Sequence, residues 1–335
     1  MSFKNIIGQE KAINILLKSL KEEKIFPSYI FMGDDGVGKK STAVEFAKAI
    51  NCLNLSSDFE VCESCSSCNK INKLCSPDLK IIEPIKGSIR IEQIRELRRE
   101  VNLKPFENRK KIYIIDQAEE MTLEASNCLL KTIEEPPDYA IIILICTNLD
   151  SILPTIVSRC QLIKFRLIDY LKIMETVLLN KINLEKGKAE LISKLAQGSI
   201  GKALKLVSDK EYFNRREKIL NYLTLILPGK YNSNLITNME KILTDMNKTE
   251  ETLDIILFWY RDILLVKELR IQKYILNVDK LKIIKEKSKV YSREMLIDIL
   301  DYIEQIQEFM KKNINKRLIL ERLYLKMVGV EYCLK

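Results

Sequence analysis

The stretch "GDDGVGKKS", residues 33–41, nearly matches the phosphate-binding pattern G-x-x-x-x-G-K-[ST], in which a strand passes through a glycine-rich turn into a helix. Gly33 and Gly38 occupy the glycine positions, and Lys39 stands where a lysine would reach the outer phosphates. The last position fails, because Lys40 replaces the serine or threonine whose oxygen holds Mg²⁺. An ammonium group cannot ligate a cation. The stretch therefore predicts a nucleotide-binding fold that lacks one of its metal ligands.

Short apolar runs alternate with amphipathic helical patterns through the first half of the chain. This alternation is typical of a parallel sheet covered by helices. The expected strands are residues 29–33, 79–84, 111–116 and 140–148, and the expected helices are 40–50, 91–101 and 123–135. After about residue 166 the strand signal disappears, and amphipathic helical patterns follow at 166–180, 188–196 and 251–269.

Asp116 ends an apolar strand, which is the position from which a P-loop ATPase holds its Mg²⁺. Hydrolytic members of that broad class usually carry glutamate next, to polarise the attacking water, but this chain carries Gln117. A neutral amide can orient water and cannot accept its proton. Lys40 and Gln117 together indicate a lost ATPase activity. For Asp116 alone a structural explanation is also open, because a strand often ends on a polar turn residue.

Composition and charge set broad limits on function. The chain has 335 residues, of which 47% are hydrophobic and 30% charged, and this length allows two or three domains. No apolar run approaches membrane-spanning length and the first residues lack the apolar core of a signal peptide, so we expect a cytoplasmic protein with no membrane partner. The formal net charge of +9 favours an acidic partner such as nucleic acid, but the lysines are scattered and solubility also explains them.

Four of the nine cysteines, Cys52, Cys62, Cys65 and Cys68, are grouped in "CLNLSSDFEVCESCSSC". In a cytosolic protein such grouping indicates a metal rather than disulfides. Four thiolates suit tetrahedral zinc, and the chain contains no histidine. Unliganded thiols, or Cys75 as the fourth ligand, remain alternatives. The other cysteines are expected to be packed residues: Cys128, Cys146, Cys160 and Cys333.

Arg159, in "LPTIVSRCQLIKF", lies between a short helical stretch that ends at Ser158 and an apolar strand. It should therefore lie at the edge of the sheet. Arginine keeps its charge at any working pH and can fork onto phosphate oxygens. A solvated surface arginine is the alternative interpretation.

Several stretches together resemble the AAA+ clamp-loader subunits of bacterial DNA polymerase III, most closely those of the delta-prime type. They are "IIGQEKA", "GDDGVGKK", the four-cysteine insert, "SPDLKIIEP", "IRIEQIREL", "IIDQAEEMTLEASNCLLKTIEEPP", "LPTIVSRCQ" and "QGSIGKAL", with "FWYRDILL" in the C-terminal helices. The resemblance implies an α/β P-loop domain of the AAA+ class with a parallel sheet at 1–166, including a zinc insert at about 52–75. It further implies a small helical lid at 167–208 and an all-α C-terminal collar for oligomerisation at 209–335.

The resemblance also implies partners. In this family a pentameric ring of delta, delta-prime and gamma/tau subunits uses ATP to open a sliding clamp and place it on primer–template DNA. Gamma and tau hydrolyse ATP, whereas delta-prime is typically rigid and nucleotide-free. We therefore expect a subunit of a DNA-directed DNA polymerase (nucleotidyltransferase) holoenzyme. The chain alone should have no enzymatic activity and should bind neither ATP nor Mg²⁺.

Carried over residue by residue, the resemblance makes Arg159 an arginine finger that acts in trans on a neighbour's ATP. It makes zinc ligands of Cys52, Cys62, Cys65 and Cys68, and a vestigial nucleotide site of Gly33, Gly36, Gly38, Lys39 and Asp116. Lys202 lies in the family's second-sensor region, where no role is assigned without a nucleotide. The chain departs from the family at Ser28 and Ser76, where histidine is common, and neither departure touches a proposed ligand.

Two other functions stay open. One is an active clamp-loader ATPase of the gamma/tau type that tolerates Lys40. The other is a zinc-dependent DNA-binding protein acting alone, which explains the cysteines and the charge but leaves the sheet motifs unused.

Overall fold

The computed structural model describes residues 3–180, 184–232, 249–269, 272–309 and 316–329. The chain divides into two compact units. One is Met1–Thr176 with Gln197–Lys202, and the other is Val177–Ala196 with Ala203–Lys335. The predicted boundaries after residues 166 and 208 stay predictions.

The first unit is built on a five-stranded parallel sheet with the strand order β2-β3-β4-β1-β5. The strands are β1 (Ser28–Met32), β2 (Leu79–Ile82), β3 (Lys111–Ile115), β4 (Ala140–Cys146) and β5 (Gln161–Lys164). Every residue of β3 and β4 is buried, as expected for parallel strands covered on both faces. In the register, Phe31 of β1 pairs with Ile145 of β4 and Ile163 of β5.

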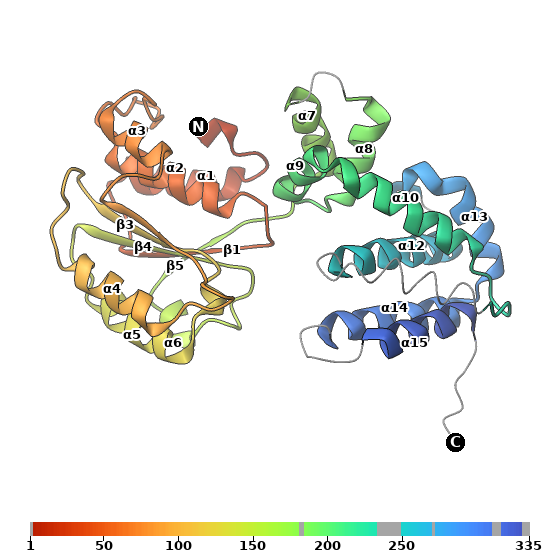
Figure 1. Cartoon of the computed structure of the whole chain (residues 1–335). Coiled ribbons are helices and arrows are strands. Elements are labelled where there is room, and N and C mark those ends of the chain that lie inside the picture. Colours follow the sequence, from red (N-terminus) through yellow and green to blue (C-terminus); the bar gives the residue numbers. More distant parts are fainter. Residues whose placement is uncertain (1–2, 181–183, 233–248, 270–271, 310–315, 330–335) are drawn as a thin grey trace. The chain divides into compact units, whose positions relative to one another are not determined.

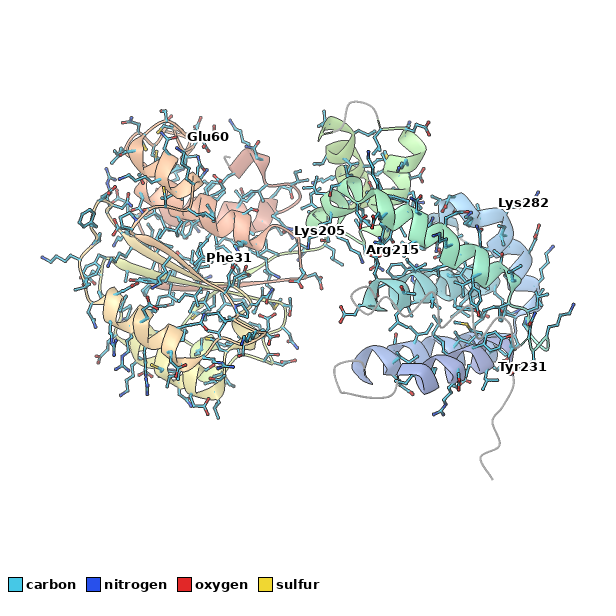
Figure 2. All side chains as sticks on the ribbon, in the orientation of Figure 1. Phe31, Glu60, Lys205, Arg215, Tyr231 and Lys282 are labelled. Carbon is cyan, nitrogen blue, oxygen red and sulfur yellow. The ribbon has the colours of Figure 1, made fainter. Side chains whose placement is uncertain are left out.

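Helices cover both faces of this sheet (Figure 1). One face carries α1 (Glu10–Lys21), α2 (Lys39–Asn51) and α3 (Ser66–Asn72), and the other carries α4 (Ile91–Val101), α5 (Leu123–Glu134) and α6 (Pro154–Val157). Each helical layer encloses its own apolar cluster against the sheet. Figure 2 shows Phe31 among the side chains that fill the first of these clusters.

Local sequence explains where several of these helices lie. Ile94, Leu97 and Val101 recur at helical spacing in α4 and are buried in the second cluster. α5 begins after Thr122, whose hydroxyl accepts the N–H of Ala125, and it ends before two prolines that cannot continue a helix.

The described residues of the second unit form helices only. α7 (Tyr170–Asn180) and α9 (Ile200–Ser208) each contribute to both units. The remaining helices are α8 (Lys186–Leu195), α10 (Lys210–Leu225), α12 (Thr249–Leu269), α13 (Leu281–Val290), α14 (Arg293–Phe309) and α15 (Lys316–Val328). Short 3-10 helices are η1 (Phe3–Asn5) and η2 (Ala118–Glu120) in the first unit, and η4 (Gln272–Tyr274) and η5 (Val278–Lys280) in the second.

α12 is the centre of the second unit, because it packs against α10, α13 and α14, while α15 packs on α14. Trp259 and Tyr260 of α12 are among the largest fully buried side chains of the described residues. Arg215 of α10, labelled in Figure 2, forms an ion pair with Glu251 of α12 at 2.8 Å. These contacts give the unit its own core.

The predicted fold class is confirmed: a parallel α/β sheet is followed by helices alone in the described residues. The expected strands and helices of the first half are present with slightly shifted ends, whereas α1 and α3 were not predicted. Within the described residues, no helix combines the length and the apolar character needed to cross a membrane.

Candidate functional site

The residues of the predicted nucleotide site gather at the carboxyl edge of the sheet, where ligands bind in open parallel α/β folds. The glycine-rich loop follows β1, Glu83 follows β2, Asp116 follows β3 and Thr147 follows β4. The loop and Asp116 were predicted from the sequence. Glu83 was not predicted, although this residue also directly follows an apolar strand.

The loop keeps its glycine geometry. Gly33, Gly36 and Gly38 all have positive φ angles, of 156°, 72° and 101°. A Cβ atom at Gly33 would lie 2.7 Å from the backbone oxygen of Phe165, so only glycine fits there. The turn that leads from β1 into α2 therefore depends on its glycines.

Lys39 is directed back onto its own loop. Its Nζ donates to the backbone oxygen of Gly33 and, at 3.0 Å, to that of Asp34. The Asp35 carboxylate lies 3.7 Å away, and the Lys39 side chain is only 6% exposed. The amine that would reach a phosphate is bonded within the protein in this conformation.

Lys40 lies between two carboxylates. Its Nζ is 3.1 Å from Asp116 Oδ2 and also contacts the Glu83 carboxylate. Burial alone would lower the pKa of Lys40, but its hydrogen bonds to Glu83 and Asp116 outweigh burial and raise that pKa above its ordinary value. The Lys40 ammonium therefore stays charged at neutral pH and offsets part of the negative charge of Glu83 and Asp116.

The residues after Asp116 also serve the fold. Gln117 is exposed and has a φ of 54°, in the left-handed region. Glu119 Oε1 accepts the backbone N–H of Thr147 at 2.9 Å and its hydroxyl at 2.6 Å. A carboxylate near the end of β3 thus holds the end of β4, a contact that sequence analysis missed.

The segment of residues 199–202 packs directly on the glycine-rich loop, within the same compact unit. The Gly201 N–H donates to Gly36 O at 2.9 Å. A Cβ atom at Gly36 would collide with Ser199 Oγ. The N–H of Lys202 donates to Ser199 Oγ at 3.1 Å, so the backbone of Lys202 helps to order the segment. Close approach of these two backbones requires glycine on both sides.

Gln9 holds the loop from its other side and was also missed. Its side chain is 3% exposed, and its Nε2 donates to Val37 O at 3.1 Å and to Arg166 O at 2.7 Å. Its Oε1 accepts the N–H of Arg166 at 3.0 Å. A single buried amide therefore connects the loop to the segment that leaves β5.

The four grouped cysteines meet in space, and their Sγ atoms lie within 4.8 Å of one another. Tetrahedral zinc with Zn–S bonds of about 2.3 Å needs sulfur atoms about 3.8 Å apart, which small side-chain adjustments provide. The cluster therefore fits a metal ion, and its members are Cys52, Cys62, Cys65 and Cys68. Cys75 is exposed and lies outside the cluster.

Backbone N–H groups already point at the sulfur atoms. Cys62 N donates to Cys52 Sγ, Cys65 N to Cys62 Sγ and Cys68 N to Cys65 Sγ, over 3.3 to 3.4 Å. Backbone hydrogen bonds from Ser64 and Cys65 lower the pKa of Cys62 to about 6, whereas burial raises the pKa of Cys52 and of Cys68. Donors placed around sulfur favour the thiolate that a metal requires.

The remaining cysteines lie elsewhere in the fold. Cys146 is buried, and Cys128 and Cys160 are partly buried against the second apolar cluster. Cys333 lies outside the described residues.

Arg159 precedes β5, which is the edge strand of the sheet, as its sequence context predicts. Its Nη2 is 3.1 Å from Glu134 Oε1 at the end of α5. Its Nη1 donates to Thr155 O at 3.0 Å and to Ser158 Oγ at 3.3 Å. The Arg159 side chain is 42% exposed. No pattern in the sequence predicts the contact with Glu134.

Comparisons with known proteins show which proteins this chain is similar to. Residues 8–169 match the family model described as DNA polymerase III, delta subunit, and residues 210–328 match the model of its C-terminal part. The DNA polymerase III subunit delta' of Bacillus subtilis is 27% identical, covering 95% of this chain and 96% of the relative. Subunit tau of the same organism is 30% identical over 95% of this chain, which spans only 60% of the length of tau.

One solved structure supports the fold. The crystal structure of a DNA polymerase III gamma subunit-related protein from Thermotoga maritima matches with a TM-score of 0.50 at 18% identity. The match covers 96% of this chain and 99% of the other. At this identity the likeness shows a shared fold alone.

Proposed function

This chain belongs to the clamp-loader family of DNA polymerase III subunits, and from that premise we propose that it is a non-catalytic subunit of the delta-prime type. It acts in the cytoplasm within a pentameric ring of delta and gamma/tau subunits. The ring loads the sliding clamp on primed DNA during replication. The chain itself neither binds Mg·ATP tightly nor hydrolyses it.

The position of Lys40 is the observation that carries this proposal. Its ammonium lies between Glu83 and Asp116, where a working site would present carboxylates toward Mg²⁺. A metal ion entering there would meet a like charge and no hydroxyl ligand. Gln117 removes the base as well, so the glycine-rich loop serves as a scaffold for the sheet.

Arg159 supplies the chain's contribution to catalysis, on the ATP of a neighbouring subunit. Its guanidinium is exposed at the sheet edge, always charged and oriented by three acceptors. An arginine presented in trans stabilises charge developing on the transferred phosphoryl group, with an effect of about 10³-fold or more. This role needs no nucleotide in the chain itself.

The cysteine cluster holds one structural zinc ion. Four thiolates without an open position match a closed structural site rather than a catalytic one. The zinc joins the end of α2 to the segment around α3.

An active ATPase of the gamma/tau type is the alternative, because tau is as similar to this chain as delta' is, at 30% and 27% identity. The two functions differ in which basic side chain ATP turnover requires. An active subunit needs Lys39 for its own ATP, whereas a non-catalytic subunit needs Arg159 for a neighbour's ATP.

The test is a clamp loader reconstituted from its separate subunits, assayed for ATP turnover stimulated by clamp and DNA. Arg159→Ala should leave assembly intact and lower turnover by the share of one site, while Lys39→Ala should leave turnover unchanged. Arg166→Ala is the matched control, because it removes another arginine near β5 whose backbone, rather than its side chain, makes the hydrogen bonds with Gln9. A large loss from Lys39→Ala with tight Mg·ATP binding by the isolated chain would overturn the proposal in favour of the gamma/tau type.

A further inference from the structure

Lys48 is fully buried, with a side chain 0% exposed, on the helix that leads into the cysteine cluster. Lysine is almost never fully buried unless its charge is paired. Lys48 has no part in the nucleotide site or in the contacts of Arg159. Its burial therefore calls for a separate explanation.

Among the described residues, three polar side chains contact the Lys48 ammonium. Glu45 Oε1, one turn earlier on α2, lies 2.7 Å away and is 3% exposed. Glu63 Oε1 and Asn72 Oδ1 each lie 2.9 Å away. Asn72 Nδ2 in turn donates to Glu63 Oε2 at 2.7 Å, which closes a ring of contacts among Lys48, Glu63 and Asn72.

These partners lie on the two segments that carry the four cysteines. Cys52 directly follows α2, which carries Glu45 and Lys48. Glu63 lies between Cys62 and Cys65 and adopts a φ of 56°, which is unusual for a residue with a side chain. The contact between Lys48 and Glu63 thus spans from the helix before Cys52 to the turn that carries the next two cysteines.

Asn72 extends the same connection to α3. That helix begins after Cys65, whose sulfur accepts the N–H of Cys68, and it ends at Asn72. Cys68 lies in its first turn. Lys48 therefore contacts both ends of the segment that supplies three of the four sulfur ligands.

We propose that Lys48 is a positioning residue for the metal site: it holds Glu63 and Asn72 against α2 and so keeps Cys62, Cys65 and Cys68 in place around the metal that Cys52 also binds. The inference rests on the proposed zinc ion. Buried partners that orient metal ligands commonly change metal affinity by about 10- to 100-fold when they are removed. Removing Lys48 also takes one positive charge away from Glu45, which is 3% exposed, and from Glu63, and this destabilises the fold of the insert.

The experiment measures zinc release from the purified full-length chain into excess chelator, with a colorimetric reporter. Lys48→Met keeps the length of the side chain and removes its charge, and it should speed zinc release by about 10-fold or more. Glu63→Gln should speed release in the same direction, and because Glu63 is 35% exposed this variant carries the test if Lys48→Met does not fold. Cobalt substitution gives a second readout, since displaced thiolates change the absorption bands of tetrahedral Co²⁺.

Lys70→Met is the matched control, because it also neutralises a lysine of the insert but breaks an ion pair with Glu107 outside the ring of contacts. It should release zinc at the parent rate. Parent-like release and cobalt spectra in Lys48→Met and Glu63→Gln would overturn the inference while leaving the zinc site intact. A parent chain that binds no zinc would instead overturn the proposed metal site itself.

Discussion

Replacing Lys40 with threonine tests directly whether an internal cation has taken the place of the metal. The substitution restores the hydroxyl of the phosphate-loop pattern and leaves Glu83 and Asp116 without the ammonium between them. Lys40 and Glu83 are 40% and 58% exposed and only Asp116 is mostly buried, at 19%, so solvent screens much of the attraction. We expect Lys40→Thr to lower the free energy of unfolding by about 1 kcal/mol without ligand.

Mg·ATP should then stabilise the variant and leave the parent unchanged. A ligand that binds only the folded state contributes RT ln(1 + [L]/Kd), so about 1 mM Mg·ATP with a Kd of about 0.1 mM adds about 1.4 kcal/mol. In a unit of the size of the first one this raises Tm by about 4 °C. The bound Mg²⁺ should stabilise the carboxylates of Glu83 and Asp116 in particular, because in the variant no Lys40 ammonium lies between them.

The assay is thermal unfolding of the parent, Lys40→Thr and a control, each with and without Mg·ATP. Lys131→Thr is the control, since it changes an exposed α5 lysine for which the structure shows no ion pair among the described residues. A parent chain whose Tm rises with Mg·ATP would refute the argument that Lys40 closes the metal position. A Lys40→Thr chain that is as stable as the parent and insensitive to Mg·ATP would refute it too.

Three further predictions concern other parts of the first unit. Asp78 is 2% exposed and accepts the backbone N–H groups of residues 106–108 at 2.7 to 2.9 Å. Asp78→Ala should therefore lower the free energy of unfolding, measured in urea, by about 3 kcal/mol. A loss below about 1 kcal/mol would contradict the importance of these hydrogen bonds. Cys65→Ser should remove zinc, measured by metal analysis, and expose the insert to protease while circular dichroism shows the sheet retained; unchanged zinc content would disprove the ligand assignment. Arg159→Lys should restore only part of the turnover that Arg159→Ala loses in the reconstituted complex, because a point charge cannot reproduce the guanidinium fork, and full recovery would argue against a bidentate phosphate contact.

Local sequence was sufficient for much of the fold and for part of the site. The strands could be predicted because both faces of a parallel sheet are covered, which leaves continuous apolar runs such as that of β4. The glycine-rich loop and the cysteine group could be predicted because their chemistry depends on closely spaced residues. Asp116 could be placed at the carboxyl edge of the sheet because it directly follows an apolar strand.

The partners of these residues could not be predicted, because each contact joins segments that are distant along the chain. Glu83 is 43 residues from Lys40, and Gln9 is 157 residues from the backbone of Arg166 that it binds. No periodicity or spacing encodes such pairs, since they arise only when the parallel strands bring their carboxyl ends to one edge and the helices pack around them. The sequence by itself therefore determined that Lys40 and Gln117 depart from the pattern of an active nucleotide site. Only the tertiary structure decided which groups Lys40 contacts. Its ammonium meets Glu83 and Asp116 because the order of the strands in the sheet brings the ends of β2 and β3 next to each other.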